Sequence, residues 1–334
     1  MEFQPYIKSI SWHGIKAVEV VAGGYEMLIV PGIGGNLIRL KDNRRNLDII
    51  RTPRSYSEFV KQPEVFGIPV LFFPNRIQDG TIKVDGMVYN LPVNEKKLNN
   101  HLHGFLYNRP WEVIGEKINN DGSAEVEMVF NIDPGKDIWS FFPHHSRFRL
   151  IYNLSRNGLQ QHFEVINHGR EPMPFGLGFH TNFNIPFRPD EDYTQYKLIM
   201  SIGRECEMGS RALATGNFLE LSDEEKKMRE TGILTQGRPI SGHFSARPLS
   251  MDGRHFNGAI IKNADKKYEL IYEVGDKFRY WVIWNHDGKG SFISVEPQTM
   301  MINAPNIKLP YETTGFVLLP SGSKWYESCN IRVV

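Results

Sequence analysis

The sequence predicts an all-β protein, a large antiparallel β-sandwich, and two observations lead to this prediction. The chain of 334 residues holds 30 Gly and 20 Pro together with 21 Phe and 13 Tyr, a mixture of turn formers and aromatic residues that favours many short strands. Turn signals recur at short intervals from end to end, and no linker, low-complexity tract or repeat divides the chain. We therefore expect residues 1–334 to form a single β-sandwich or barrel-like domain.

Alternating or apolar runs mark the expected strands in chain order. The segments with such runs are 16–30, 123–133, 147–169, 267–286 and 314–328. The third segment is expected to be a hairpin, because Asn157-Gly158 separates two alternating runs. The fourth repeats this pattern with its turn near Gly275-Asp276, and the fifth has the features of a closing hairpin.

Helical periodicity is scarce in this sequence. Residues 221–230 are highly charged and fit either a short helix or a solvated loop, and residues 55–67 have room for one or two helical turns. Residues 188–256 are the least regular part of the chain, with polar and charged stretches, so insertions are expected there.

The charge balance limits the classes of partner. Lys and Arg number 39 and Asp and Glu number 38, a net charge of +1, which argues against binding to nucleic acid or to an anionic membrane. The start, MEFQPYIKSISWHG, lacks the basic and apolar regions of a signal peptide, and the apolar stretch 66–74 is too short to cross a bilayer. With only Cys206 and Cys329, the chain has no disulfide framework, so we expect a soluble cytoplasmic protein.

An Asn-Arg pair follows the apolar strand 70–73 and is the first candidate for a binding site. Arg76, next to Asn75, offers a planar fork of donors that suits hydroxyl or carboxylate oxygens. The alternative is a structural ion pair between Arg76 and an acidic neighbour such as Asp79, and the sequence alone leaves both interpretations open.

Two histidines at alternate positions form the second candidate. His101 and His103 are expected on one face of a strand, a spacing found among metal ligands and also on any polar strand face. No HExxH motif or nearby third ligand accompanies them, so we expect no metal site. Gly104 indicates a close approach of the backbone by another group, such as a ligand.

His180 and Glu296 are the remaining candidates. His180 lies in an aromatic, glycine-rich strand whose ring faces suit the stacking of a sugar, although a core histidine would look the same. Glu296 follows an apolar strand, where burial would raise its pKa and make it a better base once ionised; a structural carboxylate is the alternative. Pro297 is expected to end the strand just after it.

Other catalytic motifs are missing from the sequence. The glycine-rich stretches VAGGYE and PGIGGN do not match the dinucleotide-binding pattern GxGxxG, and there is no GxSxG elbow or Cys/His nucleophile arrangement. We therefore expect no cofactor.

Three of these segments, in this order, resemble the aldose 1-epimerase (galactose mutarotase) family, and the likeness extends over about residues 10–330. They are the Asn-Arg to HLHG region at 75–105, HTNFNI at 180–185 and VEPQT at 295–299. The resemblance implies the galactose mutarotase-like supersandwich, a monosaccharide lying across one concave sheet, no metal or nucleotide cofactor, and a monomer or homodimer. It also implies roles for five side chains: Glu296 as general base, His180 as general acid, His103 as an orienting partner, and Asn75 and Arg76 as ligands of the sugar hydroxyls.

The chain departs from the family pattern at one position. The family commonly carries a sugar-binding Asp between the second histidine and the glutamate. In this chain Asn257 lies where that carboxylate is expected, and Asp252 is displaced from it. An amide holds hydroxyls less strongly than a carboxylate, so we expect Asn257 to bind the sugar in a divergent branch of the family.

The reaction implied is the opening and reclosure of a cyclic hemiacetal. A base that takes the C1 hydroxyl proton and an acid that protonates the ring oxygen, one on each side of the C1–O5 bond, would suffice. Three alternatives remain: a hexose-6-phosphate 1-epimerase, a non-catalytic sugar-binding sandwich, and a metal-dependent enzyme that uses His101 and His103. The first of these needs basic residues around the pocket, and the candidates are Arg109, Arg204 and Arg254.

Overall fold

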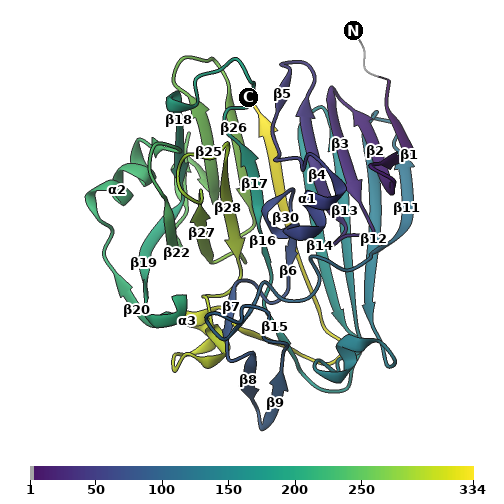
Figure 1. Ribbon diagram of the computed structural model, residues 1–334, viewed down its shortest axis with the longest axis vertical. Helices are drawn as coiled ribbons and strands as arrows, with labels where there is room; N and C mark the ends of the chain where they lie inside the picture. The colour runs from purple at the N-terminus through teal and green to yellow at the C-terminus, as the bar shows by residue number, and fades with distance from the viewer. Residues whose placement is uncertain (1–3) are drawn as a thin grey trace.

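The computed structural model describes residues 4–334, and its strands form two stacked layers (Figure 1). The back layer is a nine-stranded sheet, and the front layer combines a five-stranded and an eight-stranded sheet. All pairings within these sheets are antiparallel, so the predicted all-β sandwich is confirmed. The extent of a single domain over residues 1–334 stays a prediction.

Three large sheets account for most of the strands. The nine-stranded sheet contains, in spatial order, β11 (Glu112–Ile118), β12 (Ala124–Ile132), β13 (Ser146–Ser155), β14 (Gly158–Asn167), β30 (Lys324–Val333), β26 (Glu269–Val274), β25 (Gly258–Asn263), β18 (Tyr196–Met200) and β21 (Ile233–Leu234). The eight-stranded sheet contains β20 (Ala214–Leu219), β19 (Ile202–Met208), β22 (Ser241–Ala246), β27 (Tyr280–Trp284), β28 (Phe292–Gln298), β16 (Gly178–Phe179) and β6 (Val70–Leu71), with β17 (Thr181–Asn184) also paired to β28. The five-stranded sheet contains β1 (Tyr6–Trp12), β2 (Ile15–Ala22), β3 (Tyr25–Val30), β4 (Asn36–Asp42) and β5 (Leu47–Asp48).

Short elements complete the chain. The two-stranded ribbons pair β7 (Arg76–Gln78) with β10 (Asn100–Leu102), β8 (Thr81–Val84) with β9 (Met87–Asn90), β15 (Met173–Phe175) with β29 (Val317–Leu319), and β23 (Leu249–Met251) with β24 (Arg254–Phe256). The helices are α1 (Tyr56–Lys61), α2 (Asp223–Glu230) and α3 (Tyr311–Thr314), with 3-10 turns η1 (Pro63–Val65), η2 (Asp137–Ser140), η3 (Tyr193–Gln195), η4 (Ser210–Ala212) and η5 (Ala304–Asn306). No helix within residues 4–334 has both the length and the apolar character needed to cross a membrane.

The core lies between the back layer and the inner faces of the five-stranded and eight-stranded sheets. Tyr272 of β26 contacts the inner face of the eight-stranded sheet: its hydroxyl is 3.0 Å from the Thr181 hydroxyl, and its ring packs edge-on against Phe183 and Trp281. Because successive side chains of a strand point to opposite faces, the neighbours of these residues in the sheet, His180 among them, face outward. The fold therefore buries one face of this sheet in the core and leaves the other for a site.

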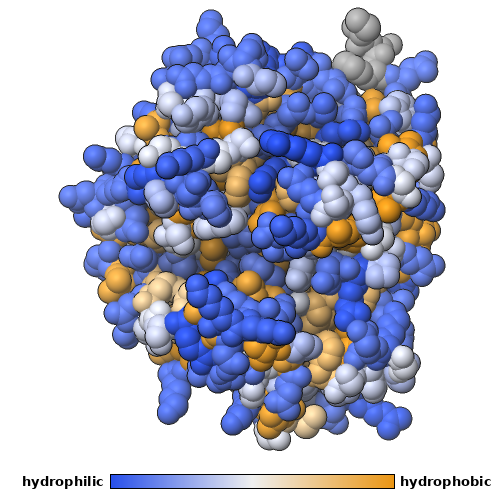
Figure 2. Space-filling view, viewed as in Figure 1, coloured by the Kyte–Doolittle hydropathy of each residue, from blue (hydrophilic) through white to orange (hydrophobic). Residues whose placement is uncertain are grey.

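Main-chain bonds join the two front sheets edge to edge. The amide of Arg51 donates to the carbonyl of Asn182 at 2.9 Å, and the amide of Asn184 donates to the carbonyl of Ile49 at 2.9 Å. The five-stranded sheet is thus attached directly to the strand that follows His180. On the face shown in Figure 2, hydrophobic side chains are scattered among hydrophilic ones rather than gathered into one large patch.

The hairpin prediction for residues 147–169 is confirmed, with a shift of one residue. The loop consists of Arg156 and Asn157, and Gly158 is already paired with Ser155. Gly158 has φ +102, and a Cβ there would lie 2.2 Å from the carbonyl oxygen of Ile331, so a glycine is needed at that position.

The other two hairpin predictions are wrong. β26 pairs with β25 and β30 in the back layer, whereas β27 pairs with β22 and β28 in the front layer. Similarly, β29 pairs with β15, and β30 pairs with β14 and β26. A strand–turn–strand pattern looks the same whether the turn folds back within one sheet or crosses to the facing sheet, so local sequence did not separate the two.

The remaining element predictions have mixed outcomes. Residues 221–230 contain helix α2, which begins with a capping box formed by Ser222 and Glu225, and α1 with η1 accounts for 55–67. The prediction of irregular insertions at 188–256 is wrong, since this stretch supplies β18, β19, β20 and β22 to the two large sheets.

Gly104 supports the loop that carries His103. It has φ +71, forms a bridge with Phe72, and a Cβ there would lie 1.9 Å from the Phe72 carbonyl oxygen. The close approach expected at Gly104 is therefore real, and the group that approaches is the main chain rather than a ligand.

We predict that Gly104→Ala destabilises the protein more than Gly86→Ala does. Both glycines have positive φ, so both variants carry the left-handed strain of about 1–2 kcal/mol. A Cβ at Gly86 would have no atom within 4 Å, whereas one at Gly104 adds a clash with Phe72, expected to cost a further 1–3 kcal/mol or so. Chemical denaturation of the two variants measures the difference; equal stabilities would contradict the packing argument.

Candidate active site

The register of the eight-stranded sheet brings His180 and Glu296 together. Gly178 pairs with Gln298 and Thr181 pairs with Val295, so the same register places His180 opposite Glu296. Side chains of directly opposite residues project from the same face, which is the outward one for this pair. The strand that carries His180 is interrupted at this residue, between β16 and β17.

The two side chains are in direct contact. His180 Nε2 lies 3.3 Å from Glu296 Oε1, and the side chains are only 5% and 2% exposed. The strand ends one residue later than predicted, because β28 continues to Gln298 and Pro297 is still paired with Trp281. The structure therefore holds Glu296 two residues before the end of its strand and His180 at the break between β16 and β17.

Asn182 fixes the orientation of the His180 ring. Its Oδ1 lies 3.2 Å from His180 Nδ1 and accepts a hydrogen bond from the Ser294 hydroxyl at 2.6 Å. Its Nδ2 donates to the main-chain carbonyls of His180 and Gly67 at 2.6 and 3.3 Å, which fixes which end of the amide faces the ring. Nδ1 of His180 therefore carries the proton of this bond, and Nε2 is the nitrogen directed at Glu296.

Gln298 plays the corresponding part for Glu296. Its Nε2 donates to Glu296 Oε2 at 3.2 Å, so each carboxylate oxygen has a different neighbour: Gln298 on one side and His180 on the other. The Gln298 Oε1 atom is buried and has no hydrogen-bond partner among the described residues.

Burial dominates the electrostatics of the pair. It raises the pKa of Glu296 to about 8, with the nearby Arg76 charge acting in the opposite direction, and it lowers the pKa of His180 to about 4. Between these values the pair holds one exchangeable proton, and the two pKa values place it on the Glu296 carboxyl. A pair with one exchangeable proton contains one group that can donate a proton and one that can accept a proton.

His103 packs against this pair. Its ring lies edge-on to the His180 ring, with 5.3 Å between centroids, and burial together with the neighbouring His180 lowers its pKa well below the usual value. The alternation that predicted a shared face with His101 does not hold, because β10 ends at Leu102 and His103 has φ +63. His101 Nδ1 instead lies 2.6 Å from the Pro92 carbonyl oxygen.

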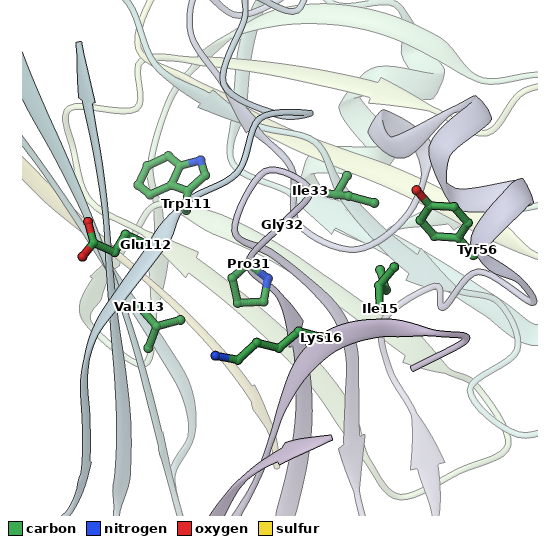
Figure 3. Close-up of a pocket in the computed structure, with 9 residues that line it drawn as sticks. All are labelled: Ile15, Lys16, Pro31, Gly32, Ile33, Tyr56, Trp111, Glu112 and Val113. Carbon is green, nitrogen blue, oxygen red and sulfur yellow. The ribbon is translucent and has the colours of Figure 1, made fainter. Parts of the chain in front are cut away.

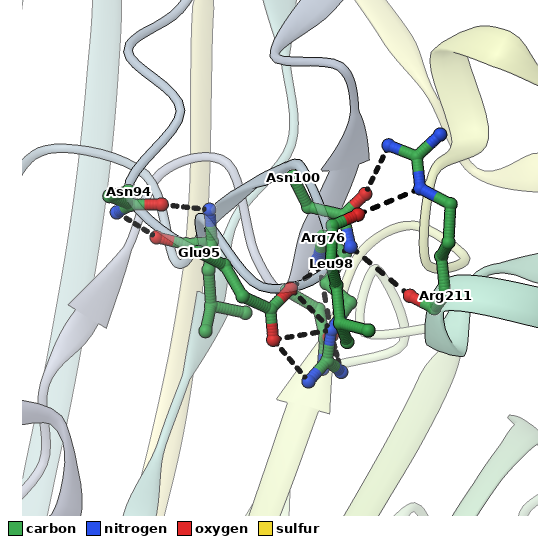
Figure 4. Close-up of polar contacts among 8 residues, drawn as sticks. Arg76, Asn94, Glu95, Leu98, Asn100 and Arg211 are labelled. Atoms are coloured by element: carbon green, nitrogen blue, oxygen red, sulfur yellow. Dashed lines mark hydrogen bonds and ion pairs between the residues drawn. The ribbon is translucent and has the colours of Figure 1, made fainter.

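Arg76 is anchored by an ion pair, as Figure 4 shows. Its Nε contacts both Glu95 carboxylate oxygens at 3.2 and 3.0 Å, and its Nη2 contacts one of them at 2.9 Å. The structural ion pair, one of the two interpretations left open, is therefore present, but its acid is Glu95 rather than Asp79, which pairs with Arg211 at 2.8 Å. Asn75 Oδ1 accepts from the Arg76 main-chain amide and Nη1 at 3.1 and 3.3 Å, so these two predicted ligands are bound to each other.

Asn257 lies elsewhere in the fold and has structural partners. Its Oδ1 accepts from the Ser201 hydroxyl at 2.9 Å, and its Nδ2 donates to the carbonyls of Gly275 and Phe278 at 3.3 and 3.1 Å. It precedes β25 of the back layer, and both ends of its amide are engaged within the fold. The expectation that Asn257 binds the sugar is therefore not supported by its contacts.

An aromatic and cationic group beside His180 was not predicted from the sequence. The Trp284 ring lies 6.2 Å from the His180 ring and 5.5 Å from the Phe292 ring. The Arg51 guanidinium lies 3.8 Å from the centre of the Phe292 ring, and its charge adds to burial in lowering the pKa of His180. The sequence shows Trp284 as an aromatic residue in an alternating run, whereas nothing in the sequence links Arg51 to Phe292 of β28.

A separate cavity of about 460 Å³ lies at the five-stranded sheet, as shown in Figure 3. Its lining residues are Ile15, Lys16, Pro31, Gly32, Ile33, Tyr56, Trp111, Glu112 and Val113. None of the predicted site residues lines it. Within residues 4–334, no group of three or more His, Cys, Asp or Glu side chains is arranged to hold a metal ion.

The comparisons with known proteins agree with one another. A family model described as aldose 1-epimerase matches residues 16–332. The chain is similar to the solved galactose mutarotase-like protein of Clostridium acetobutylicum, with 37% identity, 99% of both chains covered and a TM-score of 0.97. It shares its fold with the galactose 1-epimerase of Lactobacillus acidophilus NCFM, at 15% identity over 99% of this chain and 98% of that chain, with a TM-score of 0.75.

A curated relative matches over a shorter stretch. The chain is 26% identical over 167 residues to the uncharacterized protein YihR of Escherichia coli strain K12, and this match covers 49% of each protein. The matched stretch thus spans about half the length of that relative.

We predict that Asn257→Ala destabilises the fold without weakening sugar affinity. The change removes the acceptor of the Ser201 hydroxyl and one donor each to the Gly275 and Phe278 carbonyls, at a cost of about 1–3 kcal/mol. The exposed Asn217→Ala is a matched control, expected to stay within about 0.5 kcal/mol of wild type. Thermal unfolding gives the first result and calorimetric titration with a sugar the second; lost affinity at unchanged stability would restore Asn257 as a ligand.

Proposed function

The chain belongs to the aldose 1-epimerase family, and on that premise we propose that it interconverts the α and β anomers of a free aldose by acid–base ring opening. Membership of the family supports an epimerase activity in general; the sugar and the residue roles are our proposal. The observation that carries it is the contact of 3.3 Å between His180 Nε2 and Glu296 Oε1 on the outward face of the sheet.

The side-by-side arrangement of the pair fits the chemistry of a hemiacetal. The hydroxyl oxygen O1 and the ring oxygen O5 are attached to the same carbon, so they are close enough to be engaged together by two adjacent groups. From the sequence, acid and base were expected on opposite sides of the C1–O5 bond. With the two groups in contact, the sugar instead lies over the pair, with O1 at Glu296 and O5 at His180.

Ring opening moves two protons. The proton of the pair first passes from Glu296 to His180 Nε2. The Glu296 carboxylate then takes the proton of the O1 hydroxyl, a C1–O1 double bond forms, the C1–O5 bond breaks, and O5 takes the proton of His180 Nε2. Rotation about C1–C2 then presents the other face of the carbonyl. In reclosure Glu296 returns its proton to O1 and His180 recovers its proton from O5, so the pair ends as it began and consumes no cofactor.

The surroundings of the pair support this cycle. The positive charge of Arg76 favours the ionised carboxylate of Glu296 against the effect of burial, and Asn182 keeps Nε2 of His180 directed at the reaction. Positioned acid–base catalysis supplies about 10²–10⁴-fold, and the remainder comes from holding the sugar in place. We propose that Arg76 and Asn75 contribute to that binding and that His103 orients His180.

The phosphate alternative has less support. Arg109 is bound by both carboxylate oxygens of Asp137, at 2.8 and 2.6 Å. The Arg204 guanidinium lies over the Phe218 ring, and Arg254 is exposed on the short ribbon of β23 and β24. These three arginines were the basic residues considered for a phosphate, and they do not form one cluster.

Polarimetry on a panel of aldoses tests the proposed function. We expect the protein to accelerate the mutarotation of at least one free aldose, such as glucose or galactose, above the buffer blank. Acceleration of a hexose 6-phosphate alone would favour the phosphate alternative. Binding of a sugar without acceleration would favour a non-catalytic sandwich. The panel also tests the remaining expectation of a monosaccharide partner, whereas the cytoplasmic location and the monomer or homodimer state stay predictions.

We predict that Glu296→Gln lowers the mutarotation rate by at least about 10²-fold while sugar binding is largely retained. The amide keeps the shape of the side chain and can still contact Gln298, but it cannot take the O1 proton. Glu164→Gln, in a surface ion pair with Lys324, is the matched control and should behave as wild type. A Glu296→Gln enzyme of near wild-type rate would remove Glu296 as the base.

We predict a bell-shaped dependence of kcat/KM on pH. Below about pH 4 His180 becomes protonated while Glu296 keeps its proton, so the pair loses its base. Above about pH 8 Glu296 loses its proton while His180 stays neutral, so the pair loses its acid. Polarimetric rates from acid to alkaline pH, corrected for buffer catalysis, measure the profile, and a flat profile would contradict the shared proton.

We predict that His180→Asn slows the reaction severely and removes the acidic limb of this profile. The remaining carboxyl of Glu296 has no imidazole to exchange its proton with, so the low-pH decline should no longer follow His180. An unchanged profile in this variant would argue against the acid role of His180.

A further inference from the structure

A third buried imidazole faces the same side of the sheet and is not used by the mechanism above. His243 of β22 pairs with Val282 of β27, and Val282 pairs with Glu296 of β28. The three residues and His180 therefore form one continuous row across four strands. Since opposite residues project from the same face, His243 shares the outward face with Glu296 and His180.

A ring contact agrees with this placement. The ring of His243 lies 5.6 Å from the ring of Tyr280, the neighbour of Val282 two residues earlier on the same face. Phe244, the next residue of β22, lines a pocket together with Ile283, whose strand partner Val295 faces the core, so Phe244 points to the opposite face. The alternation along β22 thus separates a core side chain from a polar one, as it does along β28.

His243 is buried and lacks polar partners. It is 2% exposed, and neither ring nitrogen has a hydrogen-bond partner among the described residues. A neutral imidazole has one donor and one acceptor, and burying both without partners costs stability. The same face holds two more buried atoms without a partner in the described part of the chain, Gln298 Oε1 and His103 Nδ1. These unpaired polar atoms lie next to Glu296 at Gln298, next to His180 at His103, and two strands away at His243.

The spacing suits one monosaccharide. β22 and β28 are separated by β27, so their backbones lie roughly 10 Å apart, twice the distance between neighbouring strands. Val282 lies between His243 and Glu296 and forms a small apolar floor, on which the C–H groups of a sugar ring would rest. A sugar with C1 at Glu296 and His180 would then direct its far side toward His243.

We propose that His243 binds a hydroxyl on the side of the sugar remote from C1 and thereby selects the substrate, an inference that rests on the proposed function. The imidazole would donate one hydrogen bond and accept another, the pairing that a hydroxyl offers in return. Burial lowers the pKa of His243 to about 3, so the ring carries no charge near neutral pH. The selected group is accordingly an uncharged hydroxyl rather than a phosphate.

Monodeoxy sugars in combination with His243 variants test this proposal. The wild type is first assayed with the 2-, 3-, 4- and 6-deoxy forms of the parent aldose. One of these lacks the hydroxyl that His243 contacts, and its KM should exceed that of the parent aldose by at least about tenfold. For His243→Leu, the parent sugar should show a similar rise in KM, and that one deoxy sugar should bring no further loss. His243→Asn, which keeps a donor and an acceptor, should recover part of the affinity.

Controls distinguish a binding role from a structural one. The pH limits of kcat/KM should stay unchanged in His243→Leu, because the pair of His180 and Glu296 is intact. His162→Leu, at a half-buried histidine of the back layer bonded to Ser328, is the matched control and should leave KM unchanged. If His243→Leu loses the same factor with every deoxy sugar, or lowers stability with KM unchanged, the proposal is overturned.

A binding experiment separates this proposal from the proposed function. If the wild type accelerates no aldose, the proposed epimerase function is wrong. Calorimetric titration of wild type and His243→Leu with the same sugars would still measure whether loss of the imidazole and loss of one hydroxyl have coupled effects on Kd. A coupling of at least about tenfold in Kd with one deoxy sugar would support His243 as a ligand in a non-catalytic sandwich. Absence of coupling in both rate and binding would overturn the proposal.

Discussion

The antiparallel register between β28 and the interrupted strand of β16 and β17 is the constraint on which the site depends. It sets His180 opposite Glu296 and turns both to the outward face, while Val295, Thr181 and their neighbours fill the core on the other face. A slip of one residue would send the carboxylate into the hydrophobic layer and a valine into the site. The large apolar contact with the back layer therefore fixes the chemistry as well as the stability of this sheet.

Burial gives the pair its useful protonation state. In water a carboxyl group and an imidazole would together carry an ion pair near neutral pH, each with its own solvent shell. In this site the loss of that shell moves the two pKa values past one another, to about 8 for Glu296 and about 4 for His180, so the proton of the resting pair lies on the carboxyl. Groups that stabilise one location or the other, such as Arg76 and the hydroxyls of a sugar, then decide where the proton sits. A buried pair of this kind is suited to transfer a proton in either direction.

The class of fold and the central pair could be predicted from the sequence, for identifiable reasons. The alternation of apolar and polar residues predicted β12, β13 and β14. The motifs around His180 and Glu296 are short stretches of sequence, so the strands and the motifs could both be identified from the sequence alone. Which sheet a strand joins is not local, and the hairpins expected at 267–286 and 314–328 failed for that reason. The same limit applies at the site. Asn257 was suggested by its position in sequence, but its amide bonds within the fold, and the row that contains His243 is set by strand pairings that the sequence does not show.

The residues of the pair come from distant parts of the chain, and this has a consequence for folding. Ser294 and Asn182, which brace the site, are 112 residues apart in sequence, and the loop with His103 precedes both. Loops of that size close late, because the entropy they lose is recovered only when the strands are already aligned. Partly folded chains would thus lack the assembled site even when most of their secondary structure has formed. Recovery of the proposed mutarotase activity after dilution from denaturant should therefore be slower than recovery of the circular dichroism signal.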